Sequence, residues 1–426
     1  VVTVRDGMML DYETATSQSV WVRATSAAGD VVVAAVTLNV LNVFEPIVIP
    51  ITLTKLVDVY LATTDDHYTI TALAGGDSVT TQGGNDTLNG GAGADTLASG
   101  AGDDTFLVRA GDGADVVDGG IGYDVIRALS ANTVIGITSI AGIEAITAGG
   151  FAGVRLGGGS GANLIDLSAT TLTGITLIDG GNGADTIIGS VMADTISGGV
   201  GNDVLSGGAG DDVFTISGTT AGYDALNGGL GHDVVTAQAD ATVIGVSALA
   251  GIEEITAGGF AGVRLAGNAA ANLIDLSVTT LTGITRIDGG SGNDTIHGSV
   301  GDDVINGGAG VDVLTGGLGG DTFIFALAPD SRVGAWDVIS DFTHGTDHID
   351  LAQIDSDALT LGDQAFTFIG TTAFGHHAGE LRSYTGTAGY LRLLGDRDGN
   401  GVADFEIRLE VQAGVTGPLT VADLVL

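Results

Sequence analysis

The sequence predicts an all-β protein, most of it a solenoid of short strands that stack on one another. A nonapeptide unit recurs through the middle of the chain, and a fixed short period is typical of stacked repeats. Before these repeats, apolar and polar residues alternate as they do in half-buried strands. Amphipathic helices of normal length are not predicted, and only 351–361 has a pattern compatible with a short helix.

The first segment, 1–50, is expected to form strands of a β-sandwich and a linker. Apolar and polar residues alternate in Ser19–Ala24 and Ala35–Val40, and Glu45-Pro46 and Ile49-Pro50 close the segment. The chain starts within this strand pattern, without a signal peptide. We therefore expect it to be a fragment, or a processed carboxyl-terminal part, of a longer protein.

The repeat unit has the form G-G-x-G-x-D-x-U-x, where U is a large apolar residue, and Gly90–Ala98 fits at every position. The units form three blocks, at 51–126, 178–236 and 287–325. Two spacers, 127–177 and 237–286, separate the blocks and are duplicates, because Gly142–Leu156 recurs almost unchanged as Gly251–Leu265. We interpret the spacers as metal-free solenoid coils; a small separate β-domain is the alternative. An irregular β-rich cap is expected at 326–426.

The charge of the chain points to a bound cation. It carries 13 Lys and Arg residues against 52 Asp and Glu residues, a net charge of −39. Such a chain repels nucleic acid and anionic membrane surfaces, and no run of about 18 apolar residues is present to span a bilayer. The absence of cysteine excludes disulfides and thiolate zinc sites. Carboxylates without thiols favour a hard cation such as calcium.

The repeat has the chemistry of a calcium-binding turn. Glycine permits positive φ and a close approach of the backbone, while the aspartate at position six offers carboxylate oxygens. Calcium takes about six to eight oxygens, so two stacked turns must share one ion. A plain hairpin turn is the alternative for any single repeat, but not for repeats in phase. The predicted metal ligands are Asp86, Asp95, Asp104, Asp115, Asp124, Asp185, Asp194, Asp203, Asp212, Asp224, Asp233, Asp294, Asp303, Asp312 and Asp321.

Some predicted sites match the pattern less well. Asp77 lies at a degenerate start of the first block, Met192 replaces a glycine before Asp194, and insertions precede Asp115 and Asp224.

The last three positions of each repeat are expected to form a strand whose middle residue points inward. Two nonapeptides then make one coil, and the inward residues stack into two thin apolar ladders. Such a core cannot outweigh the repulsion between stacked aspartates, so folding should require the metal. The inward set is Leu88, Leu97, Phe106, Ile187, Ile196, Leu205, Phe214, Ile296, Ile305, Leu314 and Phe323.

These repeats resemble the RTX, or haemolysin-type calcium-binding, family. The resemblance implies a right-handed parallel β-roll with several Ca²⁺ ions in its turns, and export by type I secretion machinery. Gly319–Phe325, Trp336–Phe342 and Gly345–Leu351 resemble the region that follows the roll in serralysin-like secreted proteins. The ending Asp423–Leu426 resembles a type I secretion signal. Localisation outside the cell or on a bacterial surface is the implied consequence.

Two further resemblances are partial. Asp396, Asp398, Asn400 and Asp404 resemble half of an EF-hand loop, but Ile407 stands where the bidentate Glu is expected. They are weaker metal candidates, with an Asx-stabilised hairpin turn as the alternative. In the first segment, Leu10–Glu13, Val22–Thr25 and Asn42–Pro46 resemble the end of a cadherin-like domain, with Ser26 in place of the usual Asp.

No catalytic residues are predicted, because the chain has neither H-E-x-x-H nor G-x-S-x-G. Glu144 with Arg155, and Glu253 with Arg264, recur in the spacers; the interpretations are a structural salt bridge or a ligand-binding face. We expect a structural or adhesive protein of the S-layer or adhesin type, not an enzyme, with self-assembly or cell-surface polysaccharide as further partners. The alternative is the secretion and folding tail of a secreted hydrolase. An ice-binding solenoid is a third idea.

Overall fold

The computed structural model describes residues 17–25, 31–39, 48–219, 221–386, 389–410 and 418–426. The chain divides into two units, Val1–Ile49 and Pro50–Leu426. In the first unit, β1 (Ser17–Thr25) and β2 (Val31–Asn39) form an antiparallel pair. This agrees with the strand pattern, whereas the cadherin-like stretches Leu10–Glu13 and Asn42–Pro46 lie outside the described residues.

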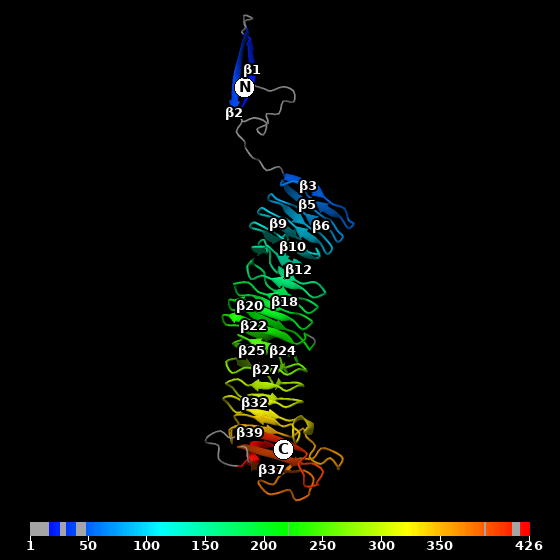
Figure 1. The fold of residues 1–426 in the computed structure, drawn as a ribbon, viewed down its shortest axis with the longest axis vertical. Helices are drawn as coiled ribbons and strands as arrows, with labels where there is room; N and C mark the ends of the chain where they lie inside the picture. Colours follow the sequence, from blue (N-terminus) through cyan, green and yellow to red (C-terminus); the bar gives the residue numbers. More distant parts are fainter. Residues whose placement is uncertain (1–16, 26–30, 40–47, 220, 387–388, 411–417) are drawn as a thin grey trace. The chain divides into compact units, whose positions relative to one another are not determined.

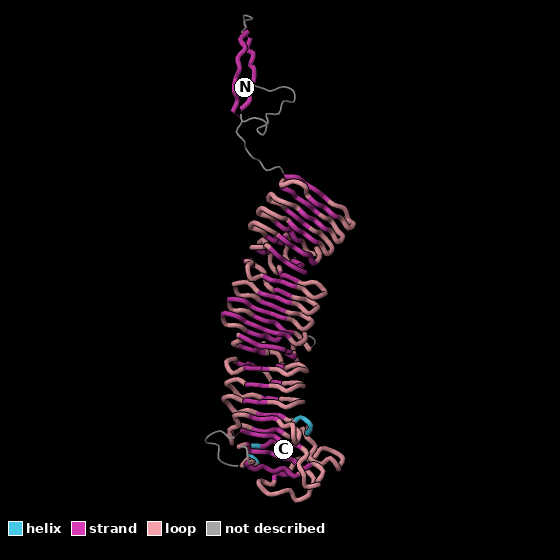
Figure 2. The backbone as a smooth tube through the Cα atoms, viewed as in Figure 1, coloured by secondary structure: helices cyan, strands magenta, loops and turns pink. Residues whose placement is uncertain are grey.

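The second unit is a parallel β-solenoid of about 14 turns, which confirms the predicted fold class. Most of its strands are three residues long, and each pairs in parallel with the strand one coil away, as Thr87 in β7 does with Thr105 in β9. Figure 2 shows the strands stacked with turns along both edges. Because the turns are short, each strand lies directly beside the corresponding strand of the coil before it.

In the first block, two parallel sheets run along the solenoid (Figure 1). One sheet consists of β3 (Val48–Thr52), β5 (His67–Thr71), β7 (Thr87–Asn89), β9 (Thr105–Val108), β11 (Val125–Ala128), β13 (Ala145–Thr147) and β16 (Thr171–Thr173). The other begins with β4 (Val59–Leu61), β6 (Ser78–Thr80), β8 (Thr96–Ala98), β10 (Ala114–Asp118) and β12 (Val134–Ala141).

The first spacer changes which strands continue the sheets. The long strand β12 pairs with β14 (Arg155–Gly157) through Val134–Gly136 and with β15 (Leu164–Asp166) through Ser139, so one strand starts two sheets. From β14 follow β17 (Ile178–Asp179), β19 (Thr195–Ser197), β21 (Val213–Ile216), β23 (Val234–Ala237), β25 (Glu254–Thr256) and β28 (Thr280–Thr282). From β15 follow β18 (Thr186–Ile188), β20 (Val204–Ala209), β22 (Asp224–Leu230) and β24 (Val243–Ala250).

The second spacer repeats this arrangement, with β24 in the role of β12. It pairs with β26 (Arg264–Ala266) through Val243–Gly245. That sheet continues with β29 (Ile287–Asp288), β31 (Val304–Asn306), β33 (Thr322–Ile324), β35 (His348–Asp350) and β40 (Leu424–Val425). The other sheet comprises β27 (Leu273–Asp275), β30 (Thr295–His297), β32 (Val313–Thr315) and β34 (Asp337–Ile339).

The carboxyl-terminal region closes the solenoid. Strand β39 (Phe405–Glu410) pairs in parallel with β34, and β38 (Tyr390–Asp396) and β37 (Glu380–Thr385) extend the sheet with antiparallel pairs. The short strand β36 (Thr367–Phe368) lies at its edge, and two 3-10 helices, η1 (Ala328–Asp330) and η2 (Val421–Asp423), flank the cap. Within the described residues no helix has the length and hydropathy needed to cross a membrane.

The expectation of a short helix at 351–361 is wrong, because this segment forms successive turns. The carboxylates of Asp350, Asp355 and Asp357 each accept a hydrogen bond from the backbone N–H two residues later. Such local bonds compete with helix formation and favour turns.

The core is the pair of apolar ladders predicted from the sequence. All of the predicted inward residues are buried, from Leu97, the most exposed at 4%, to Phe214 and Phe323 at 0%. The spacers extend the same core, since Ile165 and Ile274 are equally buried. Because each coil contributes only a few inward side chains, the interior is long and thin, and the edges hold most of the polar chemistry.

Candidate calcium sites

The aspartates at position six form hydrogen-bonded ladders along the two edges of the solenoid. Within each ladder, Oδ1 of one aspartate accepts the backbone N–H of the aspartate in the preceding coil. Asp185 N–H, for example, donates to Asp203 Oδ1 at 2.8 Å, and Asp194 N–H donates to Asp212 Oδ1 at 2.8 Å. In these regular coils the partners are 18 residues apart, so two nonapeptides make one coil.

The second carboxylate oxygen has no partner at most of these positions. It is buried, and no hydrogen bond reaches it, although a buried charged oxygen without a partner is costly. This pattern holds for Oδ2 of Asp77, Asp86, Asp95, Asp104, Asp124, Asp185, Asp203, Asp212, Asp233, Asp294, Asp312 and Asp337.

At several repeats that begin with glycine, a carbonyl oxygen from the next coil faces the aspartate carboxylate across that first glycine. A Cβ added to Gly180 would lie within 3.0 Å of both Asp185 Oδ2 and the carbonyl oxygen of Gly198. At Gly289 the corresponding pair is Asp294 Oδ2 and the carbonyl oxygen of Gly307. Two oxygens therefore converge on a space that only glycine leaves open, and this fits a calcium ion, which prefers carboxylate and carbonyl oxygens.

Burial makes the charged form of these carboxylates costly. Desolvation, with smaller contributions from neighbouring carboxylates, raises the pKa of Asp115, Asp224 and Asp321 to about 7. The pKa of Asp124 and that of Asp212 rise to about 6 for the same reasons. A bound cation would reverse this cost, because it favours the charged form of each neighbouring carboxylate.

The repeats that match the pattern poorly differ from one another in how their aspartates are hydrogen-bonded. Asp77, at the degenerate start, joins a ladder, because its Oδ1 accepts Asp58 N–H at 2.8 Å, and its Oδ2 is buried without a partner. Asp194 and Asp303 differ, because Oδ2 of each accepts the backbone N–H of Ser190 or Ser299 at 2.6 Å. Serine replaces the second glycine in these two repeats, so their carboxylates are already partly satisfied.

Asp115 and Asp224 follow the insertions and still belong to the ladders. Asp95 N–H donates to Asp115 Oδ1 and Asp203 N–H donates to Asp224 Oδ1, both at 3.0 Å. The insertion lengthens the coil without changing the partner, since the separations are 20 and 21 residues.

Four carboxylates that the sequence did not predict as ligands also join the ladders. Asp337 and Asp347, in the cap, accept the backbone N–H groups of Asp312 and Asp321 at 2.8 and 3.0 Å. In the spacers, Glu144 Oε2 accepts Asp124 N–H at 2.7 Å, and Glu253 Oε2 accepts Asp233 N–H at 2.8 Å. The only sequence signal for the glutamates was their recurrence in both spacers. Asp347 keeps the G-x-D-x-U part of the repeat, but no period of nine leads to it or to Asp337.

The predicted salt bridges between Glu144 and Arg155 and between Glu253 and Arg264 are wrong. The arginines instead contact aspartates one coil further on, Arg155 at Asp179 (3.2 Å) and Arg264 at Asp288. The glutamates instead accept backbone N–H groups of aspartates in the preceding coil.

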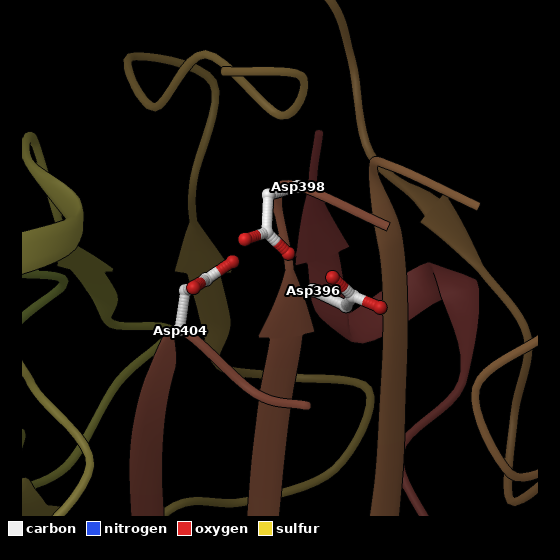
Figure 3. Close-up of side chains that lie close together, drawn as sticks. All are labelled: Asp396, Asp398 and Asp404. Carbon is white, nitrogen blue, oxygen red and sulfur yellow. The ribbon is translucent and has the colours of Figure 1, made fainter. Parts of the chain in front are cut away.

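The half EF-hand loop brings Asp396, Asp398 and Asp404 together, with one oxygen of each within 4.8 Å of the others (Figure 3). Both oxygens of Asp396 already accept backbone N–H groups, from Gly399 at 2.8 Å and Gly401 at 2.7 Å. The side chain of Asn400 donates from Nδ2 to Asp398 Oδ2 at 2.9 Å. These bonds describe an Asx-stabilised hairpin turn between β38 and β39, so a calcium ion here stays a prediction.

Comparison with known proteins agrees with this geometry. The RTX calcium-binding nonapeptide repeat matches residues 71–106, 107–128, 179–214 and 219–244, and the serralysin C-terminal domain of the M10 peptidases matches residues 255–421. A 95-residue stretch is 39% identical to the metallopeptidase AprA of Pseudomonas marginalis, covering 22% of this chain and 18% of that protein.

Two solved structures are also similar to parts of the solenoid. The AlgE6R2 subunit of the mannuronan C5-epimerase from Azotobacter vinelandii has 26% sequence identity and a TM-score of 0.29, covering 38% of this chain and 91% of its own. The AlgE6R3 subunit of that epimerase has 27% identity and a TM-score of 0.24, covering 41% and 80%.

Stacked coils with aspartates along both edges, together with the repeat matches, define a calcium-binding β-roll. The chain is an RTX repeat protein whose carboxyl-terminal region is of the serralysin type. It binds several Ca²⁺ ions, and it is a protein secreted by a type I system, outside the cell or at its surface.

Proposed function

We propose that this chain is a calcium-dependent structural or adhesive repeat protein of the S-layer or adhesin type, which folds on Ca²⁺ after type I secretion. The observation that carries the proposal is the row of buried, unpartnered Oδ2 atoms along both edges of the solenoid. The ions they hold stiffen the whole length of the solenoid, and stiffness over a long span is what a surface or adhesive protein needs.

The ligand set of each calcium ion combines two coils. The carboxylate of one aspartate, such as Asp185, and the glycine carbonyls of the adjacent turns supply the oxygens. The calcium ion supplies positive charge, and the ladder hydrogen bonds hold each Oδ1 so that Oδ2 points at the shared space. Binding free energy then becomes folding free energy, since these turns are assembled only in the stacked state.

Removal of calcium tests the folding part of the proposal. Chelation should convert the circular-dichroism spectrum from β-structure to an unfolded chain, and small-angle scattering should show a larger radius of gyration. Refolding should occur at about 10⁻⁴–10⁻³ M calcium, the range of extracellular modules. A spectrum that does not respond to chelator would contradict the proposal.

A second candidate function is the secretion and folding tail of a secreted peptidase. It is supported by the serralysin match at 255–421 and by the identity with AprA. The two candidates differ in where the protein is found. An ordered lattice or adhesive layer that chelator removes from cells supports the surface role, and calcium-dependent peptidase activity of the secreted full-length protein supports the tail.

A further inference from the structure

We propose that each spacer also holds a calcium ion, at a site where an asparagine, Asn163 or Asn272, stands in for the repeat aspartate. The proposal rests on calcium binding at the aspartate positions and extends it to the segments interpreted from sequence as metal-free. Neither asparagine lies in a segment matched by the nonapeptide repeat.

The sequence around Asn163 keeps the order of the repeat. Gly158, Gly159 and Gly161 precede it as the three glycines do in a complete unit, and Ile165 is fully buried in the inward position. Around Asn272 only the first of the three glycines is kept, as Gly267. The aspartate motif does not match either segment, because an asparagine stands where the motif requires an aspartate.

Both asparagines are members of the ladders. Asn163 N–H donates to Asp185 Oδ1 at 2.7 Å, and Asn272 N–H donates to Asp294 Oδ1 at 2.8 Å. The same bond joins Asp185 to Asp203. The asparagines are thus the first members of the ladders in the second and third blocks.

The amide oxygens occupy the place of the aspartate Oδ2 atoms. Asn163 and Asn272 are 6% and 7% exposed, and Oδ1 of each is buried without a hydrogen-bond partner. A Cβ added to Gly158 would lie within 3.0 Å of Asn163 Oδ1 and of the carbonyl oxygen of Gly180. At Gly267 the pair is Asn272 Oδ1 and the carbonyl oxygen of Gly289.

Two carbonyl-type oxygens that face each other without a donor between them can both coordinate one cation. At Asn272 a second bond favours this amide orientation, because Nδ2 donates to Asn268 Oδ1 at 3.2 Å. Calcium accepts amide oxygens as readily as backbone carbonyls, and fewer charged ligands weaken a site. The asparagine sites therefore fill at higher calcium than the aspartate sites beside them.

The alternative is a flipped amide, in which Nδ2 donates a hydrogen bond to the facing carbonyl oxygen, so that the site needs no metal. Counting bound calcium separates the two. Equilibrium dialysis at saturating calcium, with metal analysis, should show that the double variant Asn163→Ala/Asn272→Ala binds one ion fewer for each asparagine removed. Asn182→Ala, an exposed asparagine of the next coil, is the matched control and should keep the full number.

An Asn163→Asp/Asn272→Asp double variant restores the carboxylate, so it should keep the ion number and take up its weakest ions at lower free calcium. Anomalous scattering from calcium-loaded crystals should place an ion about 2.3–2.6 Å from both amide oxygens. Ions at the aspartates alone, with none at Asn163 or Asn272, would overturn this inference and leave the proposed function intact. A chain with no ions at the aspartates would refute both.

Discussion

At the scale of single residues, each repeat aspartate has two separable tasks. In Asp203, Oδ1 accepts the N–H of Asp185, and Oδ2 faces the shared space between coils. The first task needs only an acceptor, while a charged oxygen performs the second more strongly than a neutral one. Substitutions that preserve one atom and remove the other can therefore measure each contribution separately.

We expect Asp203→Ala to destabilise the calcium-loaded protein by about 1–3 kcal/mol more than Asp203→Asn, because only alanine leaves the buried Asp185 N–H without an acceptor. Both variants should bind calcium more weakly than the wild type. Urea unfolding at saturating calcium and calcium titration measure the two effects. Asp363→Asn, an exposed carboxylate of the cap, is the charge-matched control. Equal stability of the two Asp203 variants would contradict the ladder role.

The glycine at position four is constrained by the neighbouring coil. Gly201 has φ +150°, and a Cβ there would overlap the carbonyl oxygen of Gly183. We expect Gly201→Ala to cost about 3 kcal/mol, the upper end of common single substitutions, because backbone must move. Gly161→Ala should cost far less, since a Cβ there meets nothing within 4 Å. Denaturant unfolding with calcium compares them, and similar losses would refute the stacking argument.

At the scale of elements, each spacer ends one sheet, at β16 or β28, while a long strand, β12 or β24, carries the other sheet onward. Glu144 and Glu253 accept the last ladder N–H of the first and second blocks, where an aspartate on a regular coil would do so. The long strands β12 and β24 then start the sheets that continue.

We expect Glu253→Ala to loosen the junction between β23 and β25, because Asp233 N–H loses its acceptor. Hydrogen exchange at saturating calcium should become faster in 233–256. The duplicate junction at 124–147, where Glu144 is intact, provides an internal control in the same molecule. Faster exchange in both junctions, or in neither, would show that the glutamate does not hold its own junction.

At the scale of the whole molecule, a thin core is combined with a net charge of −39. Calcium should restore the β-spectrum of the chelated protein, while magnesium at the same concentration should not. Magnesium needs near-octahedral geometry and keeps its waters, so it fits poorly between stacked carbonyls. Sodium chloride at about 1 M screens the repulsion but fills no site. Circular dichroism after each addition makes the comparison. Full recovery of the β-spectrum with magnesium or with sodium chloride would imply that charge screening is sufficient for folding.

Local pattern was sufficient for much of this protein. The period of nine determined which residues point inward, such as Phe214, and which aspartates line the edges, such as Asp203. A repeat constrains its own turn and its contacts with neighbours of equal length, so these features could be predicted without the fold.

What only the tertiary structure decided lies where coil length changes. Asp337 and Asp347 join ladders across 25 and 26 residues, and Asn163 joins across 22, separations that no period predicts. The physical reason is that a ladder bond depends on which backbones lie next to each other in successive coils. Insertions alter the distance along the chain but not this stacking, so chemically different residues come to occupy one edge.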